Sequence, residues 1–348
     1  MTHGEEYMSN NTICHMEHVT VNGQQNIGLE DISLKIAENH LVALISEDDS
    51  AGEVLKVMAG LREIQSGKAD YSGLEKVWSK GNAHRETVDR KKNTRFKKEN
   101  IQSGKIAYSR LKAVTGAGKS ADEEKEKVSM FMRPVQYVPD DIVCYDGLTV
   151  AAFLQGMAGD NEGILNEADR LVNIFNIDKR ELLLNMTFEQ NRLVSVIQAM
   201  MAKPSLLLLN RPYDMLTEKT HKLLLKEIVA LYAQGSTVIL AAEHFEDVVL
   251  PAHDYIFLKE GKILGSFTKN QLPVPAKIIT MWGGSVSSML SEKMTMLIRR
   301  KGYCRFLYRE TNMKELALRL SMTGCKNFNI EELTMEEMLF EDYERWLS

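Results

Sequence analysis

The sequence predicts an α/β fold with a parallel sheet at its centre and smaller antiparallel and helical parts around it. Between residues 133 and 265, short apolar runs of strand length alternate with stretches whose apolar residues recur at helical spacing. Residues 13–37 instead alternate apolar and polar positions, which indicates an antiparallel pair of strands. After residue 267 the order of short strands and helices changes, which predicts a small α+β appendage.

The composition is that of an ordinary soluble protein, with 348 residues of which 44% are hydrophobic and 26% charged. No apolar run approaches the roughly 20 residues that cross a bilayer, and the start MTHGEEYMSN lacks a secretory pattern. The four cysteines form no CxxC pair, which favours reduced thiols in a cytoplasmic protein and gives no metal site. A membrane role is therefore expected to come through a partner.

The first 73 residues are expected to form strands around one helix. The hairpin at 13–37 precedes a short buried strand, Leu41 to Ser46, which runs directly into a helix, Val54 to Leu61. A further turn and strand follow at Ser66 to Gly73. The order strand, turn, helix is typical of a phosphate-binding unit.

A charged insertion is expected at about residues 74–132. From Lys80 to Lys127 it carries 14 Lys and Arg against 7 Asp and Glu, whereas the whole chain has a formal net charge of −5. Its densest part, Arg90 to Lys98, has the charge to contact anionic lipid headgroups, and the alternative is a solvated loop. Phe96 is the one aromatic residue in this part, so the cations lack the interleaved aromatic residues of a nucleic-acid surface and nucleic acid is not expected as a partner.

The rest of the chain reads as helices and strands in alternation. Helices are expected at 149–159, 163–177, 191–202, 218–233, 313–322 and 335–346, and strands at 133–139, 206–209, 237–241, 303–308 and 327–330, with a hairpin at 255–265. We therefore expect one domain at 1–266, with a helical subdomain at about 141–203, and a small α+β domain at 267–348.

Several framework segments resemble the ATP-binding subunits of ATP-binding-cassette (ABC) transporters. They include LEDISLKI (Leu29 to Ile36), YVPDD to LTV (Tyr137 to Val150), AKPSLLLL (Ala202 to Leu209) and FLKEGKIL (Phe257 to Leu264). The resemblance covers about residues 12–73 and 133–265. It implies a P-loop NTPase-like ABC ATPase core with an antiparallel β subdomain and a helical subdomain.

The segment SLLLLNRPYDML (Ser205 to Leu216) is similar to the family's Walker B segment. The resemblance implies that Asn210 stands where the family has the Asp that serves magnesium, and Arg211 where it has the Glu that activates water. An amide and a guanidinium supply neither function. At the position of the family's switch His this chain has Glu243.

The segment SEDDSAGEV (Ser46 to Val54) stands at the place of the family's phosphate-binding loop. Of the expected pattern only Gly52 remains among Ser46, Asp48, Asp49, Gly52 and Glu53, with no Lys and no magnesium-binding hydroxyl. Glu47, Asp48, Asp49 and Glu53 are expected to face a bound triphosphate. Each like-charge pair near 4 Å costs about 1 kcal/mol in water and about 4 kcal/mol at an effective dielectric of about 20, so nucleotide binding is disfavoured.

The signature and Q-loop positions also depart from the family pattern. The signature reads Met186, Thr187, Phe188, Glu189, Gln190, with bulky side chains where glycines approach the phosphate, and the Q-loop position is Asp140. The surface that receives a permease in the family corresponds to Asp140, Asp141, Val143 and Tyr145 in this chain.

The resemblance and these departures together predict a degenerate, non-hydrolytic ABC ATPase-like subunit. It is expected to dock on an integral-membrane permease or to pair with an active ATPase subunit, in the cytoplasm at the inner face of the membrane. No cofactor is expected. One alternative is a weakly active ATP-binding subunit of an exporter, which would use ATP and magnesium. Another is a soluble regulator whose basic insertion binds nucleic acid or lipid.

Overall fold

The computed structural model describes residues 12–23, 27–70, 135–141, 147–248, 252–272, 276–284, 294–309 and 312–333. The expected insertion at 74–132, the expected helix at 335–346, and Val143 and Tyr145 lie outside these residues. The chain divides into two compact units, Met1–Ile263 and Leu264–Ser348, which are taken separately below. None of the described helices is long and apolar enough to cross a membrane.

The parallel sheet is the centre of the larger unit, and its strands follow the order β5-β6-β7-β3-β8-β9. Its strands are β3 (Leu41–Ile45), β5 (Val135–Val138), β6 (Leu206–Asn210), β7 (Thr237–Ala242), β8 (Asp254–Lys259) and β9 (Lys262–Thr268). From β5 to β8 neighbouring strands pair in parallel. Leu206 to Leu209 are fully buried because helices or strands cover both faces of the sheet.

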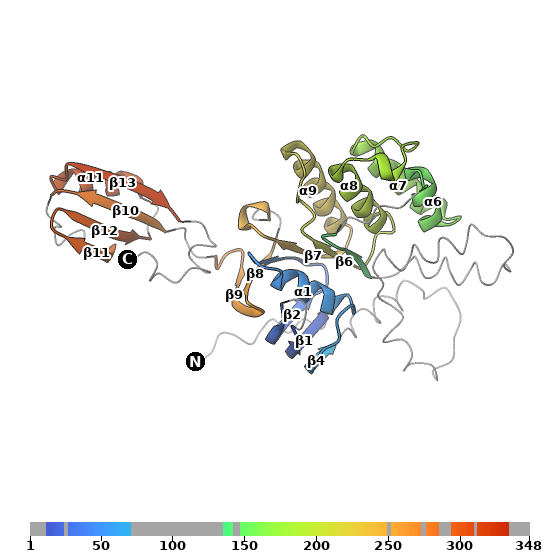
Figure 1. Ribbon diagram of the computed structural model, residues 1–348, viewed down its shortest axis with the longest axis horizontal. Helices are drawn as coiled ribbons and strands as arrows, with labels where there is room; N and C mark the ends of the chain where they lie inside the picture. The colour runs from blue at the N-terminus through green and yellow to red at the C-terminus, as the bar shows by residue number, and fades with distance from the viewer. Residues whose placement is uncertain are drawn as a thin grey trace. The chain divides into compact units, whose positions relative to one another are not determined.

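An antiparallel sheet of order β2-β1-β4 packs beside it, formed by β1 (Thr12–Val21), β2 (Leu29–Ala37) and β4 (Ser66–Asp70). Helix α1 (Ser50–Met58) lies between the two sheets (Figure 1). Val54, Leu55 and Met58 of this helix are buried in one core with residues of both sheets. The sandwiched position fixes α1 and the loop that precedes it.

The helical part contains α6 (Val150–Ala158), α7 (Glu162–Ile174) and α8 (Phe188–Met200), with a short 3-10 turn at Leu183–Asn185. Helix α9 (Glu218–Ala233) follows β6, and a second 3-10 turn (Phe245–Asp247) follows β7. Thr149, Asn161, Thr187 and Thr217 cap the four α-helices with side-chain oxygens. The predicted fold class is confirmed, and most predicted elements lie within a few residues of their expected bounds.

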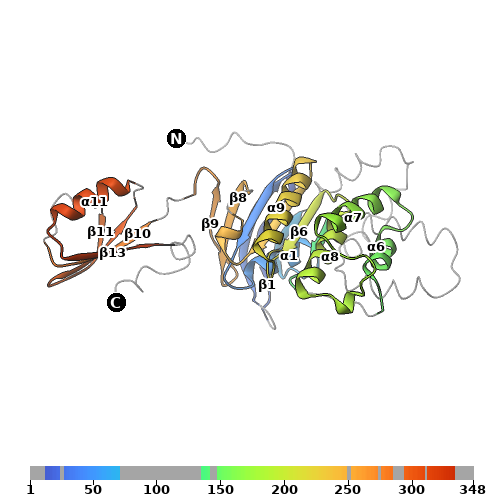
Figure 2. The same ribbon diagram turned by 90° about the horizontal axis from the view of Figure 1, so that it is seen from above.

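The smaller unit is an antiparallel sheet of order β11-β12-β10-β13 with helix α11 (Met313–Met322) on one face (Figure 2). Its strands are β10 (Lys277–Trp282), β11 (Met294–Arg300), β12 (Tyr303–Tyr308) and β13 (Asn327–Glu332). Leu316 and Leu320 of α11 pack on Ile279 and Phe306. Strands β10 and β11 were not predicted. Ile278 to Met281 are all buried, so β10 lacks the alternation of a one-sided strand, and a register shift between Met296 and Ile298 breaks the pattern of β11.

Candidate functional site

The candidate site is the edge of the parallel sheet where its strands end. The loop of residues 46–49 leaves β3 there and leads into α1. Asn210 ends β6, Glu243 follows β7, and Asp140 follows β5 by two residues. Ligands of open α/β sheets bind at this edge. The structure therefore brings together the positions that the sequence singled out for the loop, the Walker B segment and the switch.

The loop is held by its own side chains. Ser46 Oγ donates to the carbonyl of Asp48 at 2.7 Å and accepts from the N–H of Ala51 at 3.0 Å. Asp48 Oδ1 accepts from the N–H of Ser50 at 2.9 Å, and its Oδ2 accepts from the N–H of Glu260 at 2.7 Å. The N–H groups at the start of a helix are the groups that commonly bind phosphate. Here those of Ser50 and Ala51 already have partners within the chain.

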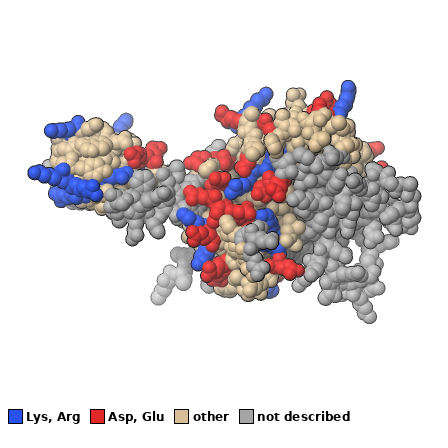
Figure 3. Space-filling view, viewed as in Figure 1, with Lys and Arg blue, Asp and Glu red and all other residues tan. Residues whose placement is uncertain are grey.

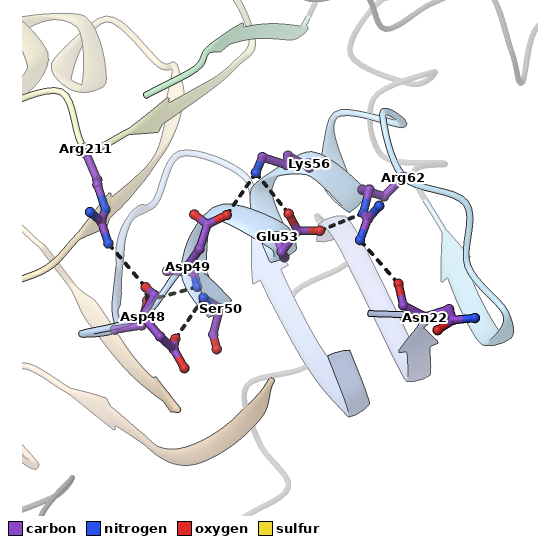
Figure 4. A network of polar contacts seen from close by, with 10 residues as sticks. Asn22, Asp48, Asp49, Ser50, Glu53, Lys56, Arg62 and Arg211 are labelled. Carbon is purple, nitrogen blue, oxygen red and sulfur yellow. Dashed lines mark hydrogen bonds and ion pairs between the residues drawn. The ribbon is translucent and has the colours of Figure 1, made fainter. Parts of the chain in front are cut away.

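A chain of ion pairs links Asp49, Glu53 and Lys56 of the α1 region to Arg62 (Figure 4). Lys56 Nζ lies 2.9 Å from Asp49 Oδ2 and 2.9 Å from Glu53 Oε1, and Arg62 Nε lies 2.6 Å from Glu53 Oε2. Arg62 also donates to the carbonyl of Asn22 at 3.3 Å. Glu53 is fully buried. The expectation that Glu53 presents its charge to a triphosphate is therefore wrong, because two cations already pair with that carboxylate.

The charges of Asp49 and Lys56 depend on this network. Burial by itself lowers the pKa of Lys56, but the hydrogen bonds to Glu53 and Asp49 outweigh burial and hold that pKa above its ordinary value. Burial raises the pKa of Asp49, and the nearby carboxylates of Asp140 and Glu53 add to the rise, although Lys56 opposes it. Asp49 is thus a carboxylate in a place that disfavours further negative charge.

Gly52, in the first turn of α1, has no room for a side chain. A Cβ at this position would lie 2.2 Å from Asp49 Oδ1 and 2.9 Å from Asn210 Nδ2. Glycine is therefore the residue that fits between the Asp49 carboxylate and the Asn210 amide. The space beside the first turn of α1, facing the end of β6, is filled by the chain's own Asp49 side chain.

Asn210 is fully buried, and neither its Oδ1 nor its Nδ2 has a hydrogen-bond partner among the described residues. The buried hydroxyl of Tyr137 on β5 lies beside the Asn210 side chain but likewise forms no hydrogen bond of standard geometry within that part of the chain. Burial raises the pKa of Tyr137, so this phenol stays neutral. The last residue of β6 therefore supplies a neutral amide, and its own side chain provides no carboxylate.

Arg211 reaches across the site. Its backbone has a positive φ of 47°, its Nη1 lies 3.3 Å from Glu243 Oε2, and its Nη2 donates to the carbonyl of Asp48 at 3.3 Å. The guanidinium thus joins the position after β6 to the one after β7 and to the loop. The sequence identified Arg211 and Glu243 separately, and the structure pairs them.

The signature positions form the start of α8. Thr187 and Gln190 make a reciprocal capping box, and Glu189 Oε1 accepts from the N–H of Thr217 at 3.0 Å and from its hydroxyl at 3.1 Å. Met186 is buried, whereas Phe188 is 66% exposed. Threonine, glutamate and glutamine here serve the helix start and its link to the segment before α9.

Arg192, which the sequence did not single out, fixes the segment after β5. From the middle of α8 it donates to the carbonyl of Pro139 at 2.6 Å and to that of Asp140. Its residue surface is 5% exposed, which is unusual for arginine. The signal available in the sequence was that this arginine falls among the apolar residues of a predicted helix, where a charged side chain needs a partner. Of the expected docking residues, Asp140 and Asp141 are described, and Asp140 is thereby tied to the helical part.

Comparison with solved structures decides the fold. The chain is similar to an ATP-binding subunit of an ABC transporter, with a TM-score of 0.53 at 15% identity over 75% of this chain and 92% of that one. The ABC fold is the one this chain adopts. The dimeric bacterial ABC cassette MJ0796 matches with a TM-score of 0.51 at 15% identity, over 74% of this chain and 98% of that one. Its post-hydrolysis form bound to ADP and Pi gives the same values. No protein-family profile matches the chain.

Proposed function

We propose that this chain is a non-hydrolytic ABC cassette-like subunit with a structural or regulatory role in transport. It docks on an integral-membrane permease or pairs with an active ATPase subunit, at the cytoplasmic face of the membrane. The observation that carries the proposal is that the Asp49 side chain fills the space beside the first turn of α1. The Asp49 carboxylate lies against Gly52, with its Oδ1 2.2 Å from where a Cβ of residue 52 would stand, and Lys56 pairs with Asp49 at 2.9 Å.

Phosphate binding is disfavoured by what surrounds the loop. Two N–H groups at the start of α1 already donate to Ser46 and Asp48 side chains. Among the described residues two cations contact the loop, and both are already paired: Lys56 with Asp49 and Glu53, and Arg211 with Glu243. A triphosphate would have to displace these contacts and approach two carboxylates, Asp48 and Asp49, at a cost of a few kcal/mol at the dielectric of a protein surface.

Hydrolysis is disfavoured by the residues at the ends of β6 and β7. Phosphoryl transfer needs a magnesium ligand and a residue that orients the attacking water. Asn210 supplies an amide in place of a carboxylate, and Arg211 is a cation paired with Glu243. A guanidinium cannot accept the proton of a water molecule.

The partner role is supported by the intact framework around the helical part. Arg192 holds Pro139 and Asp140 against α8, so the surface that we assign to the permease has a fixed support. The similar bacterial cassette MJ0796 is dimeric, which supports pairing with a second cassette as the other route. Neither role requires catalysis by this chain.

The test is binding and turnover of Mg-ATP by the purified full chain. We expect no ATPase activity and no rise of the melting temperature on adding Mg-ATP, with magnesium chloride alone as the control. A ligand at 100 times its dissociation constant adds about 2.7 kcal/mol of stability, so even a modest site would be visible. Magnesium-dependent turnover that disappears in Asn210→Ala would overturn the proposal in favour of the weakly active subunit.

A further inference from the structure

One end of the smaller unit gathers cations and exposed apolar side chains, and we name it the basic tip. It consists of Trp282, Arg299, Arg300, Lys301, Met322, Lys326 and Phe328. Strand pairing brings most of these together, because Trp282 pairs with Tyr303 and Asn327, and Arg300 also pairs with Tyr303. Figure 3 shows Lys and Arg side chains concentrated at the β11–β12 side of this unit.

The cations of the tip are uncompensated. Arg299, Arg300, Lys301 and Lys326 are exposed, and no ion pair joins them to an acidic residue within the described part of the chain. The described acidic residues of the unit pair elsewhere: Glu332 with Lys277, Glu331 with Arg305, and Glu315 with Arg319. Glu331 and Glu332 lie at the opposite end of β13 from Lys326. Among the described residues of this unit, the tip cations therefore lie at one end of the sheet and the carboxylates of β13 at the other.

The apolar residues of the tip are unusually exposed for their size. Trp282 is 40% exposed, Phe328 is 46% exposed and Met322, at the end of α11, is 68% exposed. The Trp282 ring rests edge-on against Tyr303, with 5.9 Å between the ring centroids. Tryptophan beside Lys and Arg is the combination that favours the boundary between lipid headgroups and acyl chains.

The two exposed aromatic rings lie on opposite faces of the sheet. Phe328 pairs with Met281, whose side chain belongs to the core under α11, and Trp282 is the next residue along β10. Successive side chains of a strand point to opposite faces. These rings cannot form one platform on which nucleic-acid bases stack. At the end of the sheet, however, side chains from both of its faces can contact one flat surface.

We propose that the basic tip binds the surface of an anionic lipid bilayer. The cations pair with lipid headgroups, and Trp282, Phe328 and Met322 enter the interfacial region. This contact needs neither nucleotide nor a permease, and it is separate from the segment Arg90 to Lys98. Each Lys or Arg close to an anionic leaflet strengthens binding about fivefold.

The experiment is sedimentation of the full chain with vesicles of phosphatidylcholine containing phosphatidylserine, and with vesicles of phosphatidylcholine alone. We expect binding to the anionic vesicles that weakens with salt. The variant R299E/R300E/K301E should bind at least about 100-fold more weakly. The control K219E/K222E/K226E changes the net charge equally on the exposed face of α9 and should bind within about fivefold of the unmodified chain.

A second readout reports on Trp282 itself. With Trp78→Phe and Trp346→Phe, the remaining tryptophan fluorescence should shift to the blue on adding anionic vesicles, and circular dichroism should show that the fold is kept. Equal loss in the tip and α9 variants would overturn the proposal, as would binding that survives the tip changes and disappears on deleting 80–127. A third result would also overturn the proposal: the unmodified chain binds a single-stranded oligonucleotide but no lipid, and R299E/R300E/K301E loses the oligonucleotide. That result would assign the tip to nucleic acid.

Discussion

Replacing Lys56 by methionine is expected to destabilise the larger unit by about 3 kcal/mol. Methionine keeps most of the aliphatic bulk but removes the ammonium that lies 2.9 Å from both Asp49 and Glu53. Glu53 is fully buried, and removing one partner of a buried pair typically costs about 3–5 kcal/mol. The lower figure applies because Arg62 still pairs with Glu53 at 2.6 Å.

The loss is measurable by urea unfolding and by melting. For a unit of this size, about 3 kcal/mol lowers the melting temperature by about 6 °C or more. The matched control is Lys222→Met, which removes an exposed i,i+4 pair with Glu218 and should cost at most about 0.5 kcal/mol. In the Lys56→Met background, Glu53→Gln should recover part of the loss because it removes a buried charge that lacks one cation. If Lys56→Met costs no more than Lys222→Met, the network does not hold the loop as argued.

Two further predictions concern pH and partners. Burial opposes the ionised form of Glu167, but the hydrogen bond and charge of Arg170 outweigh it, so the pKa of Glu167 lies below its ordinary value. This contribution to stability is present at neutral pH and is lost as pH falls through and below the ordinary pKa range of Glu. Arg170→Met should therefore lower the free energy of unfolding at pH 7 and make that free energy fall less steeply toward acid pH, as measured by unfolding curves. An unchanged dependence of this free energy on pH would contradict the assignment. For the docking surface, Val143→Arg should abolish co-purification of the chain with its permease in detergent, where there is no bilayer for the basic tip to bind, without changing its melting temperature. Deletion of 80–127 should leave that complex intact, and the reverse result would transfer the role to the insertion.

The central fold was predictable because its buried strands appear in the sequence as short apolar runs and its helices as apolar residues at helical spacing. Helix 218–233 and helix 313–322 have the bounds that the spacing predicted. The strand β10 was missed for a physical reason. Its buried residues are interrupted by the polar Thr280, so the sequence shows neither the alternation of a one-sided strand nor the continuous apolar run by which β3 and β6 were recognised.

The candidate site was predictable in position but not in its interactions. The sequence located Asp49, Asn210 and Arg211, whereas the partners of Asp49 and Arg211 come from a helix surface and from distant segments. Lys56 reads as an ordinary surface cation of a helix, and Arg62 lies beyond its end. That these two neutralise Glu53 depends on how α1 packs between two sheets, which no local pattern records.

The clamp made by Arg192 has a mechanical consequence. Displacing Pro139 and Asp140 breaks two hydrogen bonds unless α8 moves with them, so a force applied after β5 is carried to Thr187 and Glu189 at the start of that helix. Coupling between two sites is reciprocal in free energy. If a partner that binds at one end shifts this linkage, it changes the affinity at the other end by the same factor, and this coupling requires no ATP hydrolysis.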